Sequence, residues 1–269
     1  MSIKILKEDA LDQLKGRWWL SFFTLFTHLI ILRSTSLLSS ILSNSEYVYP
    51  IAIIEVTIIN IAIRIFLTGV LNTGRCKFLL NMTEDYHSAR FIDLFSQFKI
   101  YHKTFFLPLL MFIVPILWYI PVIAISAILL SIYMVSQPIE FIFNPRYYFT
   151  TNQFNTTMII IIVIISIFFI ASIIISLMYS QAFYILADNP NKSIFACLKE
   201  SRFIMKGNKF KFIWLHLTFT GWYFLCFLIA AIISILLNFV IGGIILAIGF
   251  LLLEPYIELT KANFYINAC

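Results

Sequence analysis

Apolar residues in this chain gather in long uncharged runs that are separated by short polar segments. The clearest run extends from Met158 to Ala187 without a charged side chain. About 18 or more consecutive apolar residues are typical of a helix that crosses the ~30 Å hydrocarbon core of a bilayer. By this criterion the pattern predicts about six membrane-spanning helices, at residues 18–42, 50–71, 105–135, 158–187, 212–240 and 241–256.

Two of the apolar runs are longer than one span requires. As a single helix, the run that ends at Ala187 would be about 45 Å long, so it must tilt, bend or project from the bilayer. The run from Phe212 to Leu253 is too long for one span, and the pair Gly242-Gly243 offers a dividing point. This division leaves residues 257–269 as a short tail.

Three polar segments contain apolar residues at spacings of three and four, which predict amphipathic surface helices at residues 3–16, 88–99 and 192–206. We expect all three helices to lie at the membrane interface, and Gly207 to end the last one. In the second helix Gln97 should be turned away from the apolar stripe. The stripe of the first helix consists of Ile3, Leu6, Ala10 and Leu14, and that of the second of Phe91, Leu94, Phe95 and Phe98.

The composition excludes an ordinary soluble domain. Apolar residues make up 61% of the chain and charged residues 12%, and the mean hydropathy is +0.94. Soluble domains are roughly 45–50% apolar and about 25% charged. We therefore expect an all-α, polytopic membrane protein that forms a single integral membrane domain over residues 1–269.

Lysine and arginine are concentrated on one side of the predicted spans. All of the 19 except Arg33, Arg64 and Arg146 lie in the N-terminal segment, in two basic connections or in the tail. Because cytoplasmic loops carry such an excess, both termini are predicted to face the cytoplasm. The net charge of +6 thus reflects membrane topology and gives no case for nucleic-acid binding.

The connection between the fourth and fifth spans is the most basic one. Each of its cations would add about 1 kcal/mol of attraction to an anionic leaflet. The plain interpretation is an anchor on the anionic inner leaflet of the bilayer. The sharper alternative is docking of a cytoplasmic partner or a nucleotide, although no Gly-rich phosphate loop is present. Four cations fall near one stripe of the predicted helix, namely Lys192, Lys199, Arg202 and Lys206.

Charged residues inside the predicted spans form a candidate polar site. Ionisable groups in lipid cost several kcal/mol unless they are paired or hydrated. Arg33 and Glu55 both fall in the outer third of the bilayer, where they either serve function or snorkel and link two helices. Arg64 is deeper and is the better candidate for lining a polar cavity, with Glu254 and Glu258 as conceivable partners.

No residue pattern indicates catalysis, a metal site or a cofactor. The cysteines have no CxxC spacing, the histidines are scattered, and HExxH and GxSxG are absent. The sequence therefore predicts a protein that is not an enzyme. The residues considered were Cys76, Cys197, Cys226, Cys269, His28, His87, His102 and His216.

Several stretches resemble the signature of a known family. They are Leu14–Trp18, Tyr179–Pro190 with its Asp-Asn-Pro end, Met205-Lys206-Gly207 and Leu217–Trp222. These residues are similar to a family of uncharacterised bacterial integral membrane proteins, catalogued as domain of unknown function 975. The resemblance covers most of the chain. It implies a multi-pass protein of the bacterial cytoplasmic membrane, and the family supplies no established activity.

Two functional classes are compatible with these patterns. The first is a non-enzymatic membrane component, either an accessory or immunity-type protein or an export-complex subunit, with a membrane protein or an ATPase as its partner. The second is a self-contained transporter of a small or amphiphilic solute through a cavity near Glu55 and Arg64. The first predicts a stable partner, and the second predicts flux through the protein alone.

Overall fold

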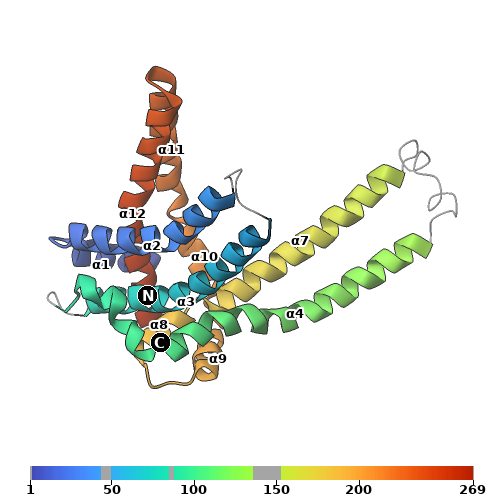
Figure 1. Ribbon diagram of the computed structural model, residues 1–269, viewed down its shortest axis with the longest axis horizontal. Coiled ribbons are helices and arrows are strands. Elements are labelled where there is room, and N and C mark those ends of the chain that lie inside the picture. The colour runs from blue at the N-terminus through green and yellow to red at the C-terminus, as the bar shows by residue number, and fades with distance from the viewer. Residues whose placement is uncertain (1, 44–49, 85–87, 136–152, 269) are drawn as a thin grey trace. The chain divides into compact units, whose positions relative to one another are not determined.

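The computed structural model describes residues 2–43, 50–84, 88–135 and 153–268, and every regular element in these ranges is a helix (Figure 1). The all-α prediction is therefore confirmed. Two compact units are present, one made of Met1–Leu109 with Tyr179–Cys269, the other of Leu110–Met178. The helices are α1 (Ile3–Leu14), α2 (Trp18–Ser43), α3 (Pro50–Thr83), the 3₁₀ helix η1 (Phe91–Ile100), α4 (Tyr101–Val135), α7 (Gln153–Tyr179), α8 (Ala182–Asp188), α9 (Ile194–Ile204), α10 (Lys209–Leu217), α11 (Thr220–Leu236) and α12 (Phe239–Ala268).

Four helical segments among the described residues are long and apolar enough to cross a membrane, as judged by length and composition. The predicted number of about six spans is thus roughly supported. The predicted spans 18–42 and 50–71 correspond to α2 and the first part of α3, and they stay predictions. The four segments are Phe91–Tyr133, Met158–Asp188, Lys209–Leu236 and Phe239–Ala268.

The second half of α12 forms the centre of the larger unit. Between Pro255 and Tyr265 every residue except Lys261 is buried, and this stretch belongs to a helix that packs against α1, α2 and α3. The prediction that residues 257–269 form a short tail is therefore wrong. Burial on all sides of this stretch is typical of a helix enclosed by other helices.

The first amphipathic helix forms as α1, but its apolar stripe faces protein. Leu6, Ala10 and Leu14 are buried, and α1 lies against α12. Ser2 caps the helix, since its hydroxyl accepts a hydrogen bond from the Ile5 amide at 3.4 Å. Gly16 adopts φ 73°, a left-handed conformation that lets the chain turn into α2.

Two glycines allow α3 to contact its neighbours backbone to backbone. A Cβ atom at Gly69 would lie 1.8 Å from the carbonyl oxygen of Thr104, and one at Gly74 would lie 1.9 Å from that of Leu94. The helix continues through both positions and beyond Leu71, where the sequence predicted the end of the span, to Thr83. These glycines therefore serve close packing.

The second surface helix, η1, buries a different face from the one predicted. Leu94 and Gln97 are its buried residues, whereas Phe91 and Phe98 are exposed. In a 3₁₀ helix residues three apart lie on one face, so Gln97 follows Leu94 against α3. The expectation that Gln97 points away is wrong because it assumed α-helical spacing.

The long apolar runs bend or break at polar positions. The run that ends at Ala187 is interrupted at Ser180 and Gln181, between α7 and α8. The turn between α11 and α12 lies at Leu237 and Asn238, before the glycine pair where the sequence placed it. The Asn238 side-chain oxygen accepts a hydrogen bond from the Val240 amide at 2.9 Å, which favours a helix start there.

Gly242 instead permits close packing of α11 against α12, which run side by side (Figure 1). A Cβ atom at Gly242 would lie 1.8 Å from the hydroxyl oxygen of Ser234. Gly207, with φ 89°, follows the end of α9, which confirms the predicted stop.

The smaller unit contains parts of α4 and α7 and is held by a polar contact. The hydroxyl oxygens of Tyr119 and Ser172 lie 2.5 Å apart, and the Tyr119 ring stacks on Phe168 at 5.9 Å between centroids. Most of the large side chains of these two helices that the structure describes are exposed. This exposure fits helices whose surroundings are lipid or other membrane helices.

Candidate functional site

Three charged side chains meet in the core of the larger unit and form what we call the ion cluster, Arg75, Glu258 and Lys261. Glu258 lies 3.4 Å from the guanidinium of Arg75 on α3 and 2.8 Å from the ammonium of Lys261 on its own helix. Only 6% of the Glu258 side chain is exposed. A carboxylate buried to this extent needs opposite charge close by, which the two cations provide.

Polar and aromatic residues from four helices surround the ion cluster. His28 of α2 and Asn72 of α3 approach to 2.9 Å between the ring nitrogen Nε2 and the amide oxygen. The rings of Tyr184 and Tyr265 stack at 5.5 Å, and the Tyr265 hydroxyl donates to the Asp188 carboxylate at 3.2 Å. The last contact fixes the Asp-Asn-Pro turn to α12.

The ion cluster was not found from the sequence, because Arg75 lies beyond the predicted end of the second span, at residue 71, and Glu258 falls in the predicted tail. A usable signal was present on α3. Leu71, Arg75, Phe78 and Met82 recur at spacings of four, three and four. An arginine at such a position shares one helix face with its apolar neighbours, so it is expected to be buried with a partner.

Three of the four residues of the sequence-predicted polar site have side chains that the structure describes. Arg33 and Arg64 are exposed, and Glu254 is half-buried. The Glu55 side chain lies outside the described residues, so its pairing with Arg33 stays a prediction. Glu258, a conceivable partner of Arg64, is placed against Arg75 instead.

The basic segment around α9 presents a mixed surface, which we call the α9 face and define as Phe195, Lys199, Arg202, Phe203 and Lys206. All five side chains are exposed, Phe195 to 66% and Phe203 to 77%. The opposite side of the helix is buried in the larger unit through Cys197, Leu198, Ser201 and Ile204.

Lys192, the remaining member of the predicted basic stripe, lies apart from the α9 face. Its ammonium contacts both carboxylate oxygens of Glu200, at 2.9 and 2.7 Å. This hydrogen bonding raises the pKa of Lys192 above its ordinary value. Lys192 therefore links the segment that precedes α9 to Glu200 within the helix.

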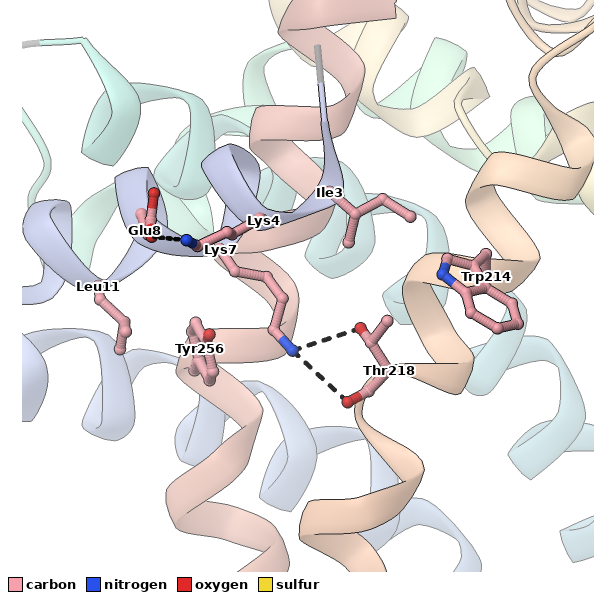
Figure 2. Close-up of a pocket in the computed structure, with 8 residues that line it drawn as sticks. All are labelled: Ile3, Lys4, Lys7, Glu8, Leu11, Trp214, Thr218 and Tyr256. Carbon is pink, nitrogen blue, oxygen red and sulfur yellow. Dashed lines mark hydrogen bonds and ion pairs between the residues drawn. The ribbon is translucent and has the colours of Figure 1, made fainter.

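An open groove of about 420 Å³ lies between α1, α10 and α12, and we call it the α1 groove (Figure 2). Lys7 reaches across it and donates hydrogen bonds to the hydroxyl of Thr218 at 3.3 Å and to the carbonyl of Thr218 at 3.5 Å. Its ammonium also lies 4.3 Å from the centroid of the Phe219 ring. The lining residues are Ile3, Lys4, Lys7, Glu8, Leu11, Trp214, Thr218 and Tyr256.

Neither the ion cluster nor the α1 groove is built like a metal centre. Within the described part of the chain, no group of three or more His, Cys, Asp or Glu side chains is placed to hold a metal ion. The geometry instead offers a closed ion cluster, an exposed aromatic and basic helix face, and a partly apolar groove that contains cations.

Comparison with known proteins gives a family and no closer relative. No curated protein and no solved structure matches the chain. The family model described as "Protein of unknown function (DUF975)" matches residues 1–268, in agreement with the resemblance of the Asp-Asn-Pro and Met-Lys-Gly elements. Since this match covers nearly the whole sequence, the chain belongs to the DUF975 family of proteins of unknown function.

Proposed function

We propose that this protein is a non-enzymatic component of a complex in the bacterial cytoplasmic membrane, and that its α9 face binds a partner protein on the cytoplasmic side. The observation that carries the proposal is the exposure of Phe195 and Phe203 beside Lys199. These residues are four apart, so they follow one another along one side of the helix in steps of about 40°.

The arrangement of the α9 face favours a protein partner over a lipid surface. An amphipathic helix that lies in a membrane separates an apolar face, which enters the bilayer, from a charged face. In α9 the apolar side is covered by the protein itself, through Leu198 and Ile204, and the two phenylalanines stand among cations. Exposed aromatic residues with arginine nearby are typical of protein interfaces.

The α9 helix is held firmly, which supports a role in recognition. Ser193 caps its start, and the Ser201 hydroxyl accepts a hydrogen bond from the Gln181 amide at 3.2 Å. The Lys103 ammonium donates to the carbonyl of Pro190 at 2.7 Å, which ties down the preceding turn. A preformed face loses little conformational entropy on binding. The matching surface would be acidic with apolar residues at its centre.

The alternative, a self-contained transporter, receives less support from the buried charges. Glu258 is paired with Arg75 and Lys261 within packed helices, so its charge is already compensated inside the protein. Arg64 is exposed on α3. A transporter would instead need such groups along an open polar path.

The double change Lys199→Glu with Phe203→Ala is expected to lower recovery of the partner at least about tenfold, since aromatic hot spots contribute about 2 kcal/mol or more. The measurement is purification from native membranes in mild detergent, followed by quantitative mass spectrometry of the bound proteins. The matched control, Lys15→Glu with Phe210→Ala, changes an exposed lysine and an exposed phenylalanine outside the α9 face and should retain the partner.

Two outcomes would contradict the proposal. Solute flux through the purified protein alone in liposomes would show a transporter. Recovery without a partner, together with loss of binding to anionic vesicles in the Lys199→Glu, Phe203→Ala protein, would show that the α9 face is a lipid anchor.

A further inference from the structure

The α1 groove contains a cation whose partners in the structure are all neutral. The Lys7 ammonium contacts a hydroxyl, a carbonyl and two aromatic rings, those of Phe219 and Tyr256. Partial burial among these groups lowers the pKa of Lys7. Lys4 and Glu8 form an ion pair at 3.8 Å, so Lys7 leaves the groove with one uncompensated positive charge.

The walls of the α1 groove are apolar beside this cation. Leu11 of α1 and Trp214 of α10 are both exposed, Trp214 to 62%, and Figure 2 shows them on opposite sides of Lys7. A groove with one cation, a polar edge and exposed apolar walls fits a molecule with a negatively charged head and a hydrocarbon part. Its volume of about 420 Å³ would hold a head group.

The order of residues along α10 and α11 places the groove at the level of lipid head groups. Lys209 and Lys211 begin α10, Trp214 follows, and the apolar helix α11 starts at Thr220. In membrane proteins cations lie in the head-group region and tryptophan lies at the border with hydrocarbon. The α1 groove would thus open where phospholipids present their phosphates.

We propose that the α1 groove binds one anionic phospholipid of the inner leaflet, with the phosphate at Lys7 and the acyl chains beside Leu11 and Trp214. Binding of this lipid would fasten α1 to the junction of α10 and α11 at Thr218. The inference goes beyond the proposed function and is independent of it, because α9 contributes no residue to the α1 groove.

The test is lipid binding to the full-length protein, followed by native mass spectrometry with phosphatidylglycerol and phosphatidylcholine of identical acyl chains. The wild-type protein is expected to bind one phosphatidylglycerol about fivefold more tightly than phosphatidylcholine. Both lipids have a phosphate, but only phosphatidylglycerol has a net negative charge, and one lysine near anionic lipid contributes about 1 kcal/mol. Lys7→Met should remove this preference. Lys15→Met, a change directly after α1 and outside the groove, should leave it intact.

The Lys7→Met protein loses the contacts with Thr218 and could misfold for that reason, so a second groove variant is needed. Leu11→Glu places a carboxylate at the exposed wall and should weaken phosphatidylglycerol binding about fivefold without a change in thermal stability. Equal binding of the two lipids by the wild-type protein would overturn the proposal, as would unchanged binding by both groove variants. Displacement of the lipid by excess inorganic phosphate would also overturn it, since the groove would then be a site for the free anion.

Discussion

Replacing Gly74 by alanine is expected to lower the free energy of unfolding of the larger unit by about 3 kcal/mol, the upper part of the usual range for overpacked sites. The added methyl group would lie 1.9 Å from the carbonyl oxygen of Leu94. Because that atom belongs to the backbone, the clash can be relieved only if η1 moves away from α3. The measurement is thermal unfolding in detergent, where the midpoint should fall by about 10 °C.

The matched control is Gly243→Ala on α12. Apart from its chain neighbours and the nearby backbone of its own helix, no atom of the described residues lies within 4 Å of a Cβ built at Gly243. Alanine should therefore raise stability slightly, by about 0.5–1 kcal/mol, as is usual in the interior of a helix. Equal midpoints for the Gly74→Ala and Gly243→Ala proteins would show that α3 and η1 do not contact each other as described.

The apolar helices could be predicted from the sequence because hydropathy is a local property. A long uncharged run forms a helix in lipid regardless of its neighbours, since its backbone must satisfy its own hydrogen bonds. For this reason the predicted starts of the first two spans, residues 18 and 50, match those of α2 and α3. The α9 helix was found from another local signal, the amphipathic spacing of its residues with Gly207 after it.

The core of the larger unit around α12 could not be predicted in the same way, because its stability comes from contacts between segments that are distant in the sequence. Arg75 and Glu258 are polar in any hydropathy profile, yet each is the partner that allows the other to be buried. Asn263 is another case, since its amide exchanges hydrogen bonds with that of Gln13 at 3.0 and 3.2 Å. A single sequence does not show which distant residues form such pairs. For this reason the first helix was predicted to lie at the membrane interface, and residues 257–269 were predicted to be a tail.

The glycines show the same limit. Gly74 lies beyond the predicted end of the second span, and Gly242 was expected to help divide the last apolar run, whereas both lie within helices at points of close contact. A glycine in an apolar helix is compatible with flexibility and with close packing. Only the neighbouring element distinguishes these uses, and that element is far away in the sequence.

Replacing Glu258 by leucine is expected to lower the free energy of unfolding by about 3 kcal/mol, the lower end of the range for a broken buried ion pair. The change leaves Arg75 and Lys261 without their shared carboxylate in a largely buried place. The lower end applies because these two side chains are 22% and 23% exposed, so water can solvate them in part. The thermal midpoint in detergent is again the measurement.

A combined variant distinguishes pairing from a simple loss of volume. If the charges stabilise the fold only by compensating one another, the combination of Glu258→Leu with Arg75→Met and Lys261→Met should recover most of the lost stability, because both cations that lose their partner are then also removed. Glu200→Gln is the control for a more exposed pair, since it removes the charge that faces Lys192 and should cost only about 0–1 kcal/mol. A combined variant that is as unstable as Glu258→Leu alone would show that Glu258 has a partner in the core besides Arg75 and Lys261. The ion cluster would then become the first place to search for a solute or proton site, in favour of the transporter alternative.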